Sequence, residues 1–301
     1  MRHALHLLTL TLALSLAAAC GTTSDPSSQP ATGGAPTIDD LRSATFHGLA
    51  DIDHPVTLAS GYWEDEPNRL SVTFPDDFHV LGDLDGSAPD EAVVTLAVST
   101  GGSGTFNYLA IVGRRDGAIT NLATAPLGDR VQLRDLRIDN GAIVADVLQA
   151  GPDDAMCCPG ELVTRSWKLE GSTLTELASG EPARLSTAAL GDGAWVLRAW
   201  TFSEAAPAAP EVTLQLSEGR LVGSSGCNTY NAAITPGDTP GALTIGPIAG
   251  TRMMCPDAEM SVEDRFIKQL EQVMSFGFML GQLSLTYRTD DGGGVMLFER
   301  R

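Results

Sequence analysis

Short strand-type segments separated by tight turns dominate residues 42–177, and they constrain the fold more than any other feature. Turn signals recur about every eight to twelve residues, a spacing typical of all-β folds. Asp-Gly at 116–117 and Asn-Gly at 140–141 supply the positive φ angles that tight hairpins need, and Glu-Gly at 170–171 marks a further turn. Strands are predicted at 92–98, 106–112, 131–138, 143–148 and 163–169. No long helical periodicity interrupts them, so 42–177 is predicted to be a mostly-β domain of uncertain family.

The remaining sequence mixes strands with one helix. Alternation of apolar and polar residues predicts half-buried strands, and a turn at 290–294 leads into the last of them. The helix is predicted to open at Ser261, with Asp264 three residues on, and to end at Gly277. The alternating strands lie at 212–216, 243–245 and 283–287, and the helically spaced apolar residues are Val262, Phe266, Ile267, Leu270, Val273 and Met274. The predicted class is therefore β-rich α+β, with an antiparallel sheet and one packed helix in the second domain.

The first 20 residues have the features of an export signal. Arg2 supplies a positive charge, and residues 5–19 form an apolar run that is too short to span a bilayer permanently. The run ends in LAAAC, which resembles the lipobox of bacterial lipoproteins, and that resemblance implies a lipid on Cys20. The alternative is an ordinary signal peptide and an unmodified Cys20 thiol.

A flexible tether is predicted at 21–41, because Ser, Thr, Pro and Gly dominate its first part and cannot pack. The expected location is the bacterial cell envelope. The lipid would hold the protein on the outer face of the cytoplasmic membrane or on the outer membrane. A small, polar, Pro-containing segment at 178–188 is predicted to link the two domains.

The chain is strongly acidic, with a formal net charge of −19. Phosphate binding needs clustered Lys and Arg, so nucleic acid is not an expected partner. Lys168 and Lys268 are the only two lysines, so a polybasic membrane patch is not expected either. The expected partners are the membrane, through the N-terminal lipid, and an unidentified envelope protein or ligand.

Two short motifs in the C-terminal part resemble those of a known bacterial domain. The first is GSSGCNTYNA at 223–232, and the second is TRMMCPDAE at 251–259. With the helix and hairpin that follow, they resemble the META domain of the HslJ family of bacterial envelope proteins over about 189–301. The resemblance implies an α+β fold and a non-enzymatic binding or stress-response role. It also implies a disulfide between Cys227 and Cys255, because the two motifs lie close together in that fold.

Three motif residues form a candidate recognition patch, namely Asn228, Tyr230 and Arg252. The alternative is a scaffold role, in which Asn228 bonds a tight turn and Arg252 braces carbonyls or a carboxylate. Gly223 suits a close approach of strands. The methionines at 253–254 are expected to fill the core rather than to bind a cofactor.

Four cysteines follow the signal segment, and four cysteines allow three pairings. If Cys227 pairs with Cys255, as the resemblance implies, Cys157 and Cys158 remain as a vicinal pair. One interpretation is a strained vicinal disulfide that acts as a redox or conformational switch. The other is two thiols, or a rigid turn. A zinc site is not expected, because adjacent cysteines lack the spacing and the further ligands that zinc needs.

An acidic loop at 81–94 is a weak calcium candidate. It looks like a degenerate calcium loop of the FG-GAP or dockerin type, and calcium needs six to eight oxygen ligands. A serine replaces the expected third carboxylate, and the alternative is an Asx-turn that joins two strands. The candidate ligands are Asp83, Asp85, Ser87, Asp90 and Glu91. No other cofactor is expected.

Catalytic machinery is sparse in this sequence. The histidines beyond the signal segment are His47, His54 and His79, and 189–301 contains none. Serines and cysteines of that segment therefore lack a local imidazole base. The prediction is a non-enzymatic envelope lipoprotein with a binding or stress-response role. The alternatives are a hydrolytic or redox enzyme that uses the N-terminal domain and a calcium-stabilised adhesion module.

Overall fold

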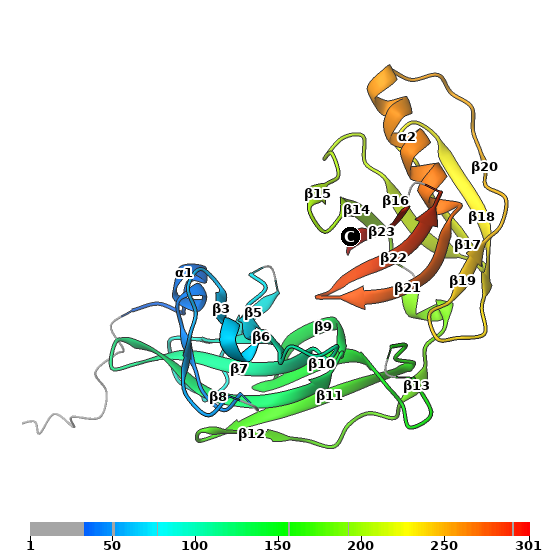
Figure 1. Ribbon diagram of the computed structural model, residues 1–301. Coiled ribbons are helices and arrows are strands. Elements are labelled where there is room, and N and C mark those ends of the chain that lie inside the picture. Colours follow the sequence, from blue (N-terminus) through cyan, green and yellow to red (C-terminus); the bar gives the residue numbers. More distant parts are fainter. Residues whose placement is uncertain (1–32, 50–51, 77, 156, 192, 291) are drawn as a thin grey trace, which may run out of the picture. The chain divides into compact units, whose positions relative to one another are not determined.

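The computed structural model describes residues 33–49, 52–76, 78–155, 157–191, 193–290 and 292–301 (Figure 1). The export signal, Cys20 and most of the predicted tether lie outside the described residues. None of the described helices is long and apolar enough to cross a membrane. The described chain is built mainly from antiparallel strands with two α-helices, which confirms the predicted β-rich α+β class.

The first sheet of the N-terminal half contains strands from residue 62 to residue 129. Its order is β3-β4-β6-β7-β8, and β5 also pairs with β6. Glu66–Asn68 form a 3-10 turn, η1, between the first two of these strands. The strands are β3 (Tyr62–Asp65), β4 (Leu70–Thr73), β5 (His79–Gly82), β6 (Glu91–Ser99), β7 (Phe106–Arg115) and β8 (Ala118–Asp129).

A second antiparallel sheet follows directly, in the order β12-β11-β10-β9. Asp116 and Asn140 take left-handed φ angles of 52° and 49°, and a glycine with positive φ follows each, as the turn dipeptides predict. The strands are β9 (Gln132–Asp139), β10 (Ala142–Gln149), β11 (Glu161–Glu170) and β12 (Thr173–Glu176). All five strands predicted in this half are present, each within about three residues of the predicted bounds.

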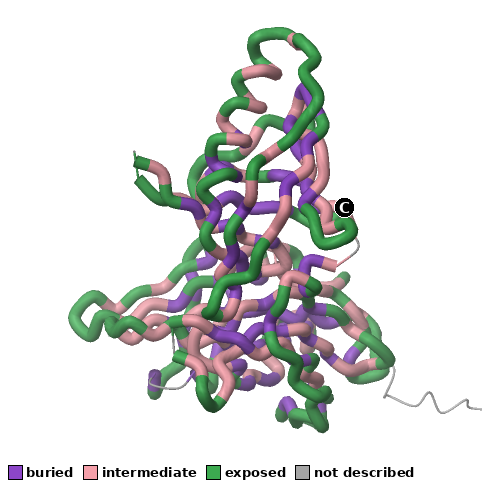
Figure 2. Tube along the Cα trace, turned by 90° about the vertical axis from the view of Figure 1, so that its right-hand side faces the viewer, coloured by how far each residue is buried: buried purple, intermediate pink, exposed green. Residues whose placement is uncertain are grey.

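Strand β6 is apolar on both faces because it separates two cores. Val93 packs into the core between the two sheets, together with Ile111 and Trp167. Its neighbours Ala92 and Val94 point to the opposite face and pack into a different core. Two-sided burial explains why this strand is a nearly continuous apolar run rather than an alternating one. Figure 2 shows buried positions alternating with more exposed ones along many of the other strands.

The second of these cores corrects the predicted end of the tether. Instead of remaining a tether to residue 41, the chain forms helix α1 (Ile38–Arg42), followed by β1 (Thr45–Phe46) and β2 (Val56–Thr57). Thr37 and Asp40 form a capping box at the start of α1. Leu41 and Phe46 are fully buried in the core with Val94. The predicted tether therefore ends several residues before residue 41, because the apolar side chains of this segment pack against a face of the first sheet.

The C-terminal half contains one large antiparallel sheet in the order β19-β18-β17-β16-β14-β23-β22-β21. Its two ends approach each other, because Ala242 bridges to Ser275 and the Phe276 amide donates to Gly241 O at 2.8 Å. The sheet is thus nearly closed into a barrel. Its strands are β14 (Trp195–Thr201), β16 (Thr213–Ser217), β17 (Arg220–Ser224), β18 (Thr229–Pro236), β19 (Leu243–Ile245), β21 (Val273–Met279), β22 (Gln282–Thr289) and β23 (Gly292–Arg300).

Short elements complete this half and the segment before it. The 178–188 segment holds a two-residue strand, β13 (Ala183–Arg184), which pairs with β11, and η2 (Thr187–Leu190) follows. Two further short strands pair with the large sheet at its margins. These strands are β15 (Glu204–Ala205), beside β14, and β20 (Ala249–Gly250), beside β18.

Helix α2 (Asp257–Leu270) packs on the sheet with Phe266 and Leu270 fully buried, but both predicted ends were wrong. Pro256 occupies the N-cap position, so the helix begins at Asp257 rather than at Ser261, and Asp257 lies in the first turn, where it complements the helix dipole. Ser261 therefore lies inside the helix, where its hydroxyl donates to Asp257 O at 2.8 Å. At the other end, Gly277 lies within strand β21, so the predicted helical run had joined two elements.

Gly223 allows three neighbouring strands to approach closely. It lies opposite Tyr230 on β18, and the Tyr230 hydroxyl donates to Thr213 O on β16 at 3.0 Å. A Cβ atom at position 223 would lie 2.0 Å from that same carbonyl oxygen. The predicted close strand approach is thus present at this glycine.

Candidate functional site

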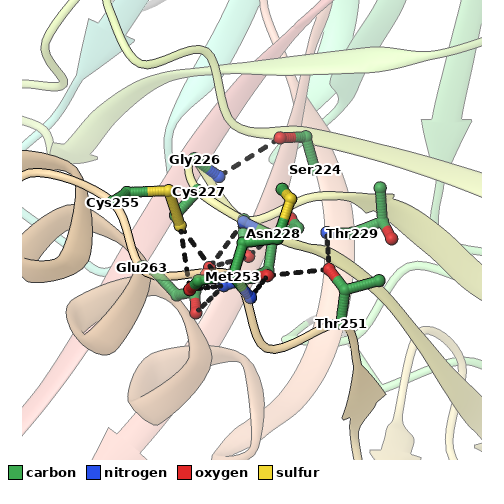
Figure 3. The surroundings of a disulfide bond; sticks show 10 residues. Ser224, Gly226, Cys227, Asn228, Thr229, Thr251, Met253, Cys255 and Glu263 are labelled. Atoms are coloured by element: carbon green, nitrogen blue, oxygen red, sulfur yellow. Dashed lines mark hydrogen bonds between the residues drawn. A yellow bond between two sulfur atoms is a disulfide. The ribbon is translucent and has the colours of Figure 1, made fainter.

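The two META-like motifs meet at a disulfide. Cys227, just before β18, is bonded to Cys255, just before α2, with the two Cα atoms 5.9 Å apart (Figure 3). The structure therefore joins the two cysteines that the resemblance paired. The bond connects the β17–β18 turn to the segment that leads into the helix.

Asn228 forms the centre of the hydrogen-bond network beside this disulfide (Figure 3). Its side-chain oxygen accepts from the Met253 amide and from the Thr251 hydroxyl, both at 2.7 Å. Its side-chain nitrogen donates to Met253 O at 3.3 Å and to Glu263 Oε1 at 3.0 Å. Asn228 is 4% exposed, so these bonds form away from bulk water. The side chain therefore fixes the backbone of residues 251–253 against β18 and α2.

Glu263 anchors the same network from helix α2. Its carboxylate accepts from the Asn228 amide at 2.8 Å and lies 2.5 Å from the Ser225 hydroxyl oxygen. Burial raises the pKa of Glu263, but the hydrogen bonds from Ser225 and Asn228 outweigh it and hold the pKa below its ordinary value. Glu263 is therefore a charged acceptor at neutral pH and has no proton to donate as a general acid.

The Ser225–Glu263 pair lacks what a hydrolase needs. Ser225 is 1% exposed, so a substrate cannot reach its hydroxyl. The Ser225 amide donates to Asn228 O at 2.7 Å, a bond that holds the tight turn closed. Nucleophilic catalysis needs an accessible nucleophile with a free base, and the carboxylate here already accepts from three donors. The pair is a structural one.

Two of the three predicted patch residues do not lie on the surface. Asn228 is buried in the network, and Tyr230 is 4% exposed. Tyr230 packs edge-on against the Phe266 ring of α2, and burial raises the pKa of its hydroxyl far above the ordinary value. The three residues therefore cannot act together as a surface patch. The scaffold alternative holds for Asn228 and Tyr230, whereas Arg252 is exposed.

The exposed side chains at this site belong instead to a short loop, 251–254. Met254 is 96% exposed and Met253 is 57% exposed, so the expectation that both fill the core was wrong. Asn228 holds both backbone polar groups of Met253, and the neighbouring Cys255 is tied to Cys227. A fixed backbone thus presents Arg252, Met253 and Met254 to solvent. We call residues 251–254 the display loop.

The acidic loop brings three of its five candidate ligands together. Oxygen atoms of Asp83, Asp85 and Glu91 lie within 4.8 Å of one another. Ser87 instead donates to Asp85 Oδ1, through its amide at 2.9 Å and its hydroxyl at 2.6 Å. Asp90 is exposed and does not join the group.

The carboxylate oxygens of Asp83 and Asp85 already accept hydrogen bonds from donors of the protein itself. Asp83 Oδ1 accepts from the Gly86 amide at 2.6 Å, and the bond from the Ser87 amide to Asp85 Oδ1 has the Asx-turn spacing that was the alternative to calcium. Arg115 lies 2.5 Å from Asp85 Oδ2 and 3.6 Å from Glu91 Oε1, so a guanidinium supplies the positive charge. Burial raises the pKa of Asp85, but the bonds from Ser87 and the charge of Arg115 outweigh it and lower the pKa. Calcium would need six to eight oxygens and would have to displace Arg115, so the fit to a calcium site is poor.

Glu91 carries a testable electrostatic cost. Its side chain is fully buried, and burial raises its pKa even though the Leu84 amide donates to Oε2 at 3.0 Å. The Glu91 carboxyl group therefore binds its proton more tightly in the folded state than in the unfolded state. As the pH rises from about 4.5 through the raised pKa, ionisation of Glu91 lowers the free energy of unfolding. We expect Glu91→Gln to be more stable than the wild type near neutral pH, with no such gain at pH values well below 4.5.

Urea unfolding of both proteins at a series of pH values measures this difference. Asp90→Asn is the matched control, because Asp90 lies in the same loop but is exposed. A stability difference between Glu91→Gln and the wild type that does not change with pH would contradict the prediction.

Among the described residues of the N-terminal half, neither His54 nor His79 hydrogen-bonds a carboxylate through the contacts of its Nδ1 atom. The His79 Nδ1 atom lies 3.0 Å from the backbone oxygen of Asp76, and the Asp76 carboxylate binds Arg42. His54 Nδ1 lies 3.0 Å from Pro55 O, next to it in the chain. The described residues thus provide no local support for a hydrolase centre at these histidines.

Comparisons with known proteins identify the C-terminal part of the chain. Residues 188–301 match the family model of the META domain, so this chain contains a META domain at its C-terminal end. No curated protein matches the chain. An NMR structure of a protein from Burkholderia xenovorans is similar to it, with 26% sequence identity over 42% of this chain and 94% of that chain. The TM-score is 0.30.

Proposed function

We propose that this protein is a lipid-anchored binding protein of the bacterial cell envelope that acts without catalysis, through the display loop of its META domain. The lipobox-like LAAAC segment supports the anchor on Cys20, and the Ser/Thr/Pro/Gly-rich stretch behind it supports a tether. A binding or stress-response role is what the META resemblance implies. The ligand is a protein or small molecule of the envelope.

The display loop is the observation that carries this proposal. Met253 and Met254 place two neighbouring exposed apolar side chains on the loop, and the flexible side chain of methionine adapts to different partner surfaces. The disulfide and the bonds from Asn228 hold the loop backbone in one conformation before any partner binds. Such preorganisation lowers the entropy cost of association, so a small exposed surface can bind usefully. Arg252 adds a positive charge to an otherwise strongly acidic protein.

The surroundings of Ser225 support a role without chemistry. Ser225 is buried, the neighbouring Glu263 carboxylate already accepts from three donors, and the sequence of 189–301 contains no histidine. Two of the four cysteine sulfur atoms beyond Cys20 are tied in the disulfide. The observations therefore favour recognition over turnover.

Site-specific photo-crosslinking in living cells tests the proposal. With a photoreactive amino acid in place of Met254, we expect a discrete crosslinked product in the membrane fraction, because the loop contacts its partner there. The same residue in place of Phe202 is the matched control, since Phe202 is also a large apolar side chain of this domain and is 70% exposed. Adding Arg252→Glu to the Met254 probe should weaken the product.

The same experiment with Cys20→Ala tests the anchor. That variant should leave the membrane fraction or remain as uncleaved precursor, and a metabolically incorporated lipid label should appear only on the wild type. Equal crosslinking from positions 254 and 202, or none from either, would contradict binding through the display loop. A wild type without lipid label would contradict the anchor alone.

A further inference from the structure

The vicinal cysteines of the N-terminal half lie on a loop that is fastened at its base. The buried carboxylate of Asp154 accepts from the Gly151 amide at 2.9 Å and from the Gly160 amide at 2.8 Å. Arg184 lies 2.5 Å from the other oxygen of the same carboxylate. A single side chain thus joins both ends of the 151–160 loop.

The thiols themselves remain reachable from solvent. Cys157 is exposed and Cys158 is half-buried, and both are free thiols in this structure. The Cys158 amide donates to Ala155 O at 2.8 Å, which closes a tight turn, and the buried Pro159 follows. The backbone of the pair is therefore held on both sides, and the two sulfur atoms are confined to neighbouring positions.

From this placement we infer that Cys157 and Cys158 are a thiol–disulfide exchange site that is oxidised by low-molecular-weight disulfides to a reversible vicinal disulfide. The two sulfurs cannot diffuse apart, so the second step of the exchange is intramolecular and has a high effective concentration. This site lies outside the META domain and does not depend on the display loop or on the lipid anchor.

The exchange has two balanced steps. The Cys157 thiol loses its proton, and its sulfur attacks a small disulfide, forming a mixed disulfide and releasing one thiolate. The Cys158 sulfur, after losing its proton, then attacks the Cys157 sulfur, so the mixed bond breaks and the second thiolate leaves. The protein pair loses two electrons, the small disulfide gains them, and the released thiolates take up the two protons. Cys157 is the attacking residue because it is the more exposed of the two thiols. Interaction with Cys157 and burial raise the pKa of the Cys158 thiol, so Cys158 forms the reactive thiolate less readily.

The product should be easier to reduce than the disulfide of the META domain. Adjacent cysteines close an eight-membered ring that stores strain, and strained, exposed disulfides have the more oxidising potentials. Cys227 and Cys255 are separated by 28 residues and form no such small ring. The two sulfur pairs of this protein are therefore expected to respond to different reductant concentrations.

Peptide mapping of the full chain after treatment with oxidised glutathione tests the inference. We expect the peptide that contains Cys157 and Cys158 to become lighter by two hydrogen atoms, with no glutathione left on it. In a dithiothreitol series, this bond should open at about a tenfold lower concentration than the Cys227–Cys255 bond, which is the internal standard. Recovery of two unmodified thiols, or of opening at the same concentration as the standard, would overturn the inference.

Single substitutions distinguish the attacking role of Cys157 from the resolving role of Cys158. Cys158→Ser should retain glutathione on Cys157, because the resolving thiol is missing, and Cys157→Ser should react with glutathione more slowly. Thermal unfolding of both variants checks that the loop remains folded. Glutathione that stays on the wild-type protein as stably as on Cys158→Ser would show that no vicinal bond forms and would also overturn the inference.

Discussion

Replacing Asn228 by alanine is expected to lower the free energy of unfolding by about 3 kcal/mol and to loosen the display loop. The substitution removes the bonds that the Asn228 side chain makes with Met253 and Thr251, and it leaves Glu263 Oε1 without the donor from Asn228. An unsatisfied buried polar group costs about 1–3 kcal/mol, and the partial exposure of the loop allows water to replace some of the lost bonds.

Urea unfolding of the full chain measures the loss of stability, and hydrogen exchange of residues 251–254 measures the local effect. Asn231→Ala is the matched control, because Asn231 lies three residues further on, within β18, but makes one described side-chain bond, with Arg220 at 2.5 Å. That surface bond is worth less than about 1 kcal/mol. Equal destabilisation by the two alanine substitutions would show that the Asn228 network does not hold the loop.

Gly223→Ala is expected to destabilise the META domain by about 3 kcal/mol, which corresponds to a fall in melting temperature of roughly 6–12 °C. The new methyl group would lie 2.0 Å from Thr213 O, a backbone atom of a paired strand that cannot swing away. Relief requires the strands to separate, and separation would break the bond from the Tyr230 hydroxyl to the same oxygen. Tyr230 would then have a buried hydroxyl without an acceptor.

Differential scanning calorimetry of the full chain tests this prediction. Gly102→Ala is the matched control, since no atom lies within 4 Å of a Cβ built at that glycine and its φ is not in the left-handed region. The control should unfold within a few degrees of the wild type. If Gly223→Ala has the same melting temperature as the control, β16 and β17 do not approach as closely as the structure shows.

The strands were predicted well because the turn dipeptides that bound them depend only on neighbouring residues. Asp-Gly and Asn-Gly supply the positive φ angles of tight hairpins wherever they occur, and Asp116 and Asn140 adopt those angles. The helix bounds were harder, because apolar residues at helical spacing ran on from α2 into β21. Periodicity cannot separate two consecutive elements when a buried strand residue, such as Val273, continues the helical pattern.

The predictions for the candidate site were wrong where the exposure of a side chain depends on residues far away in the sequence. Motif membership suggested Asn228 and Tyr230 as surface residues, yet both are buried by contacts with α2 and β16. The methionines at 253–254 were expected in the core because apolar side chains usually lie there. No signal within the motif shows that Asn228, 25 residues earlier in the chain, holds the Met253 backbone.

The sequence by itself determined the strand segments, the hairpin turns, the acidic balance and the META domain, because each depends on neighbouring residues or on a recognisable motif. The tertiary structure alone decided that β6 faces two cores, that Arg115 neutralises Asp85, and that the display loop is exposed on a fixed backbone. Burial and hydrogen bonding are set by residues far apart in the chain. Their consequences appear only when the sheets and the helix have packed.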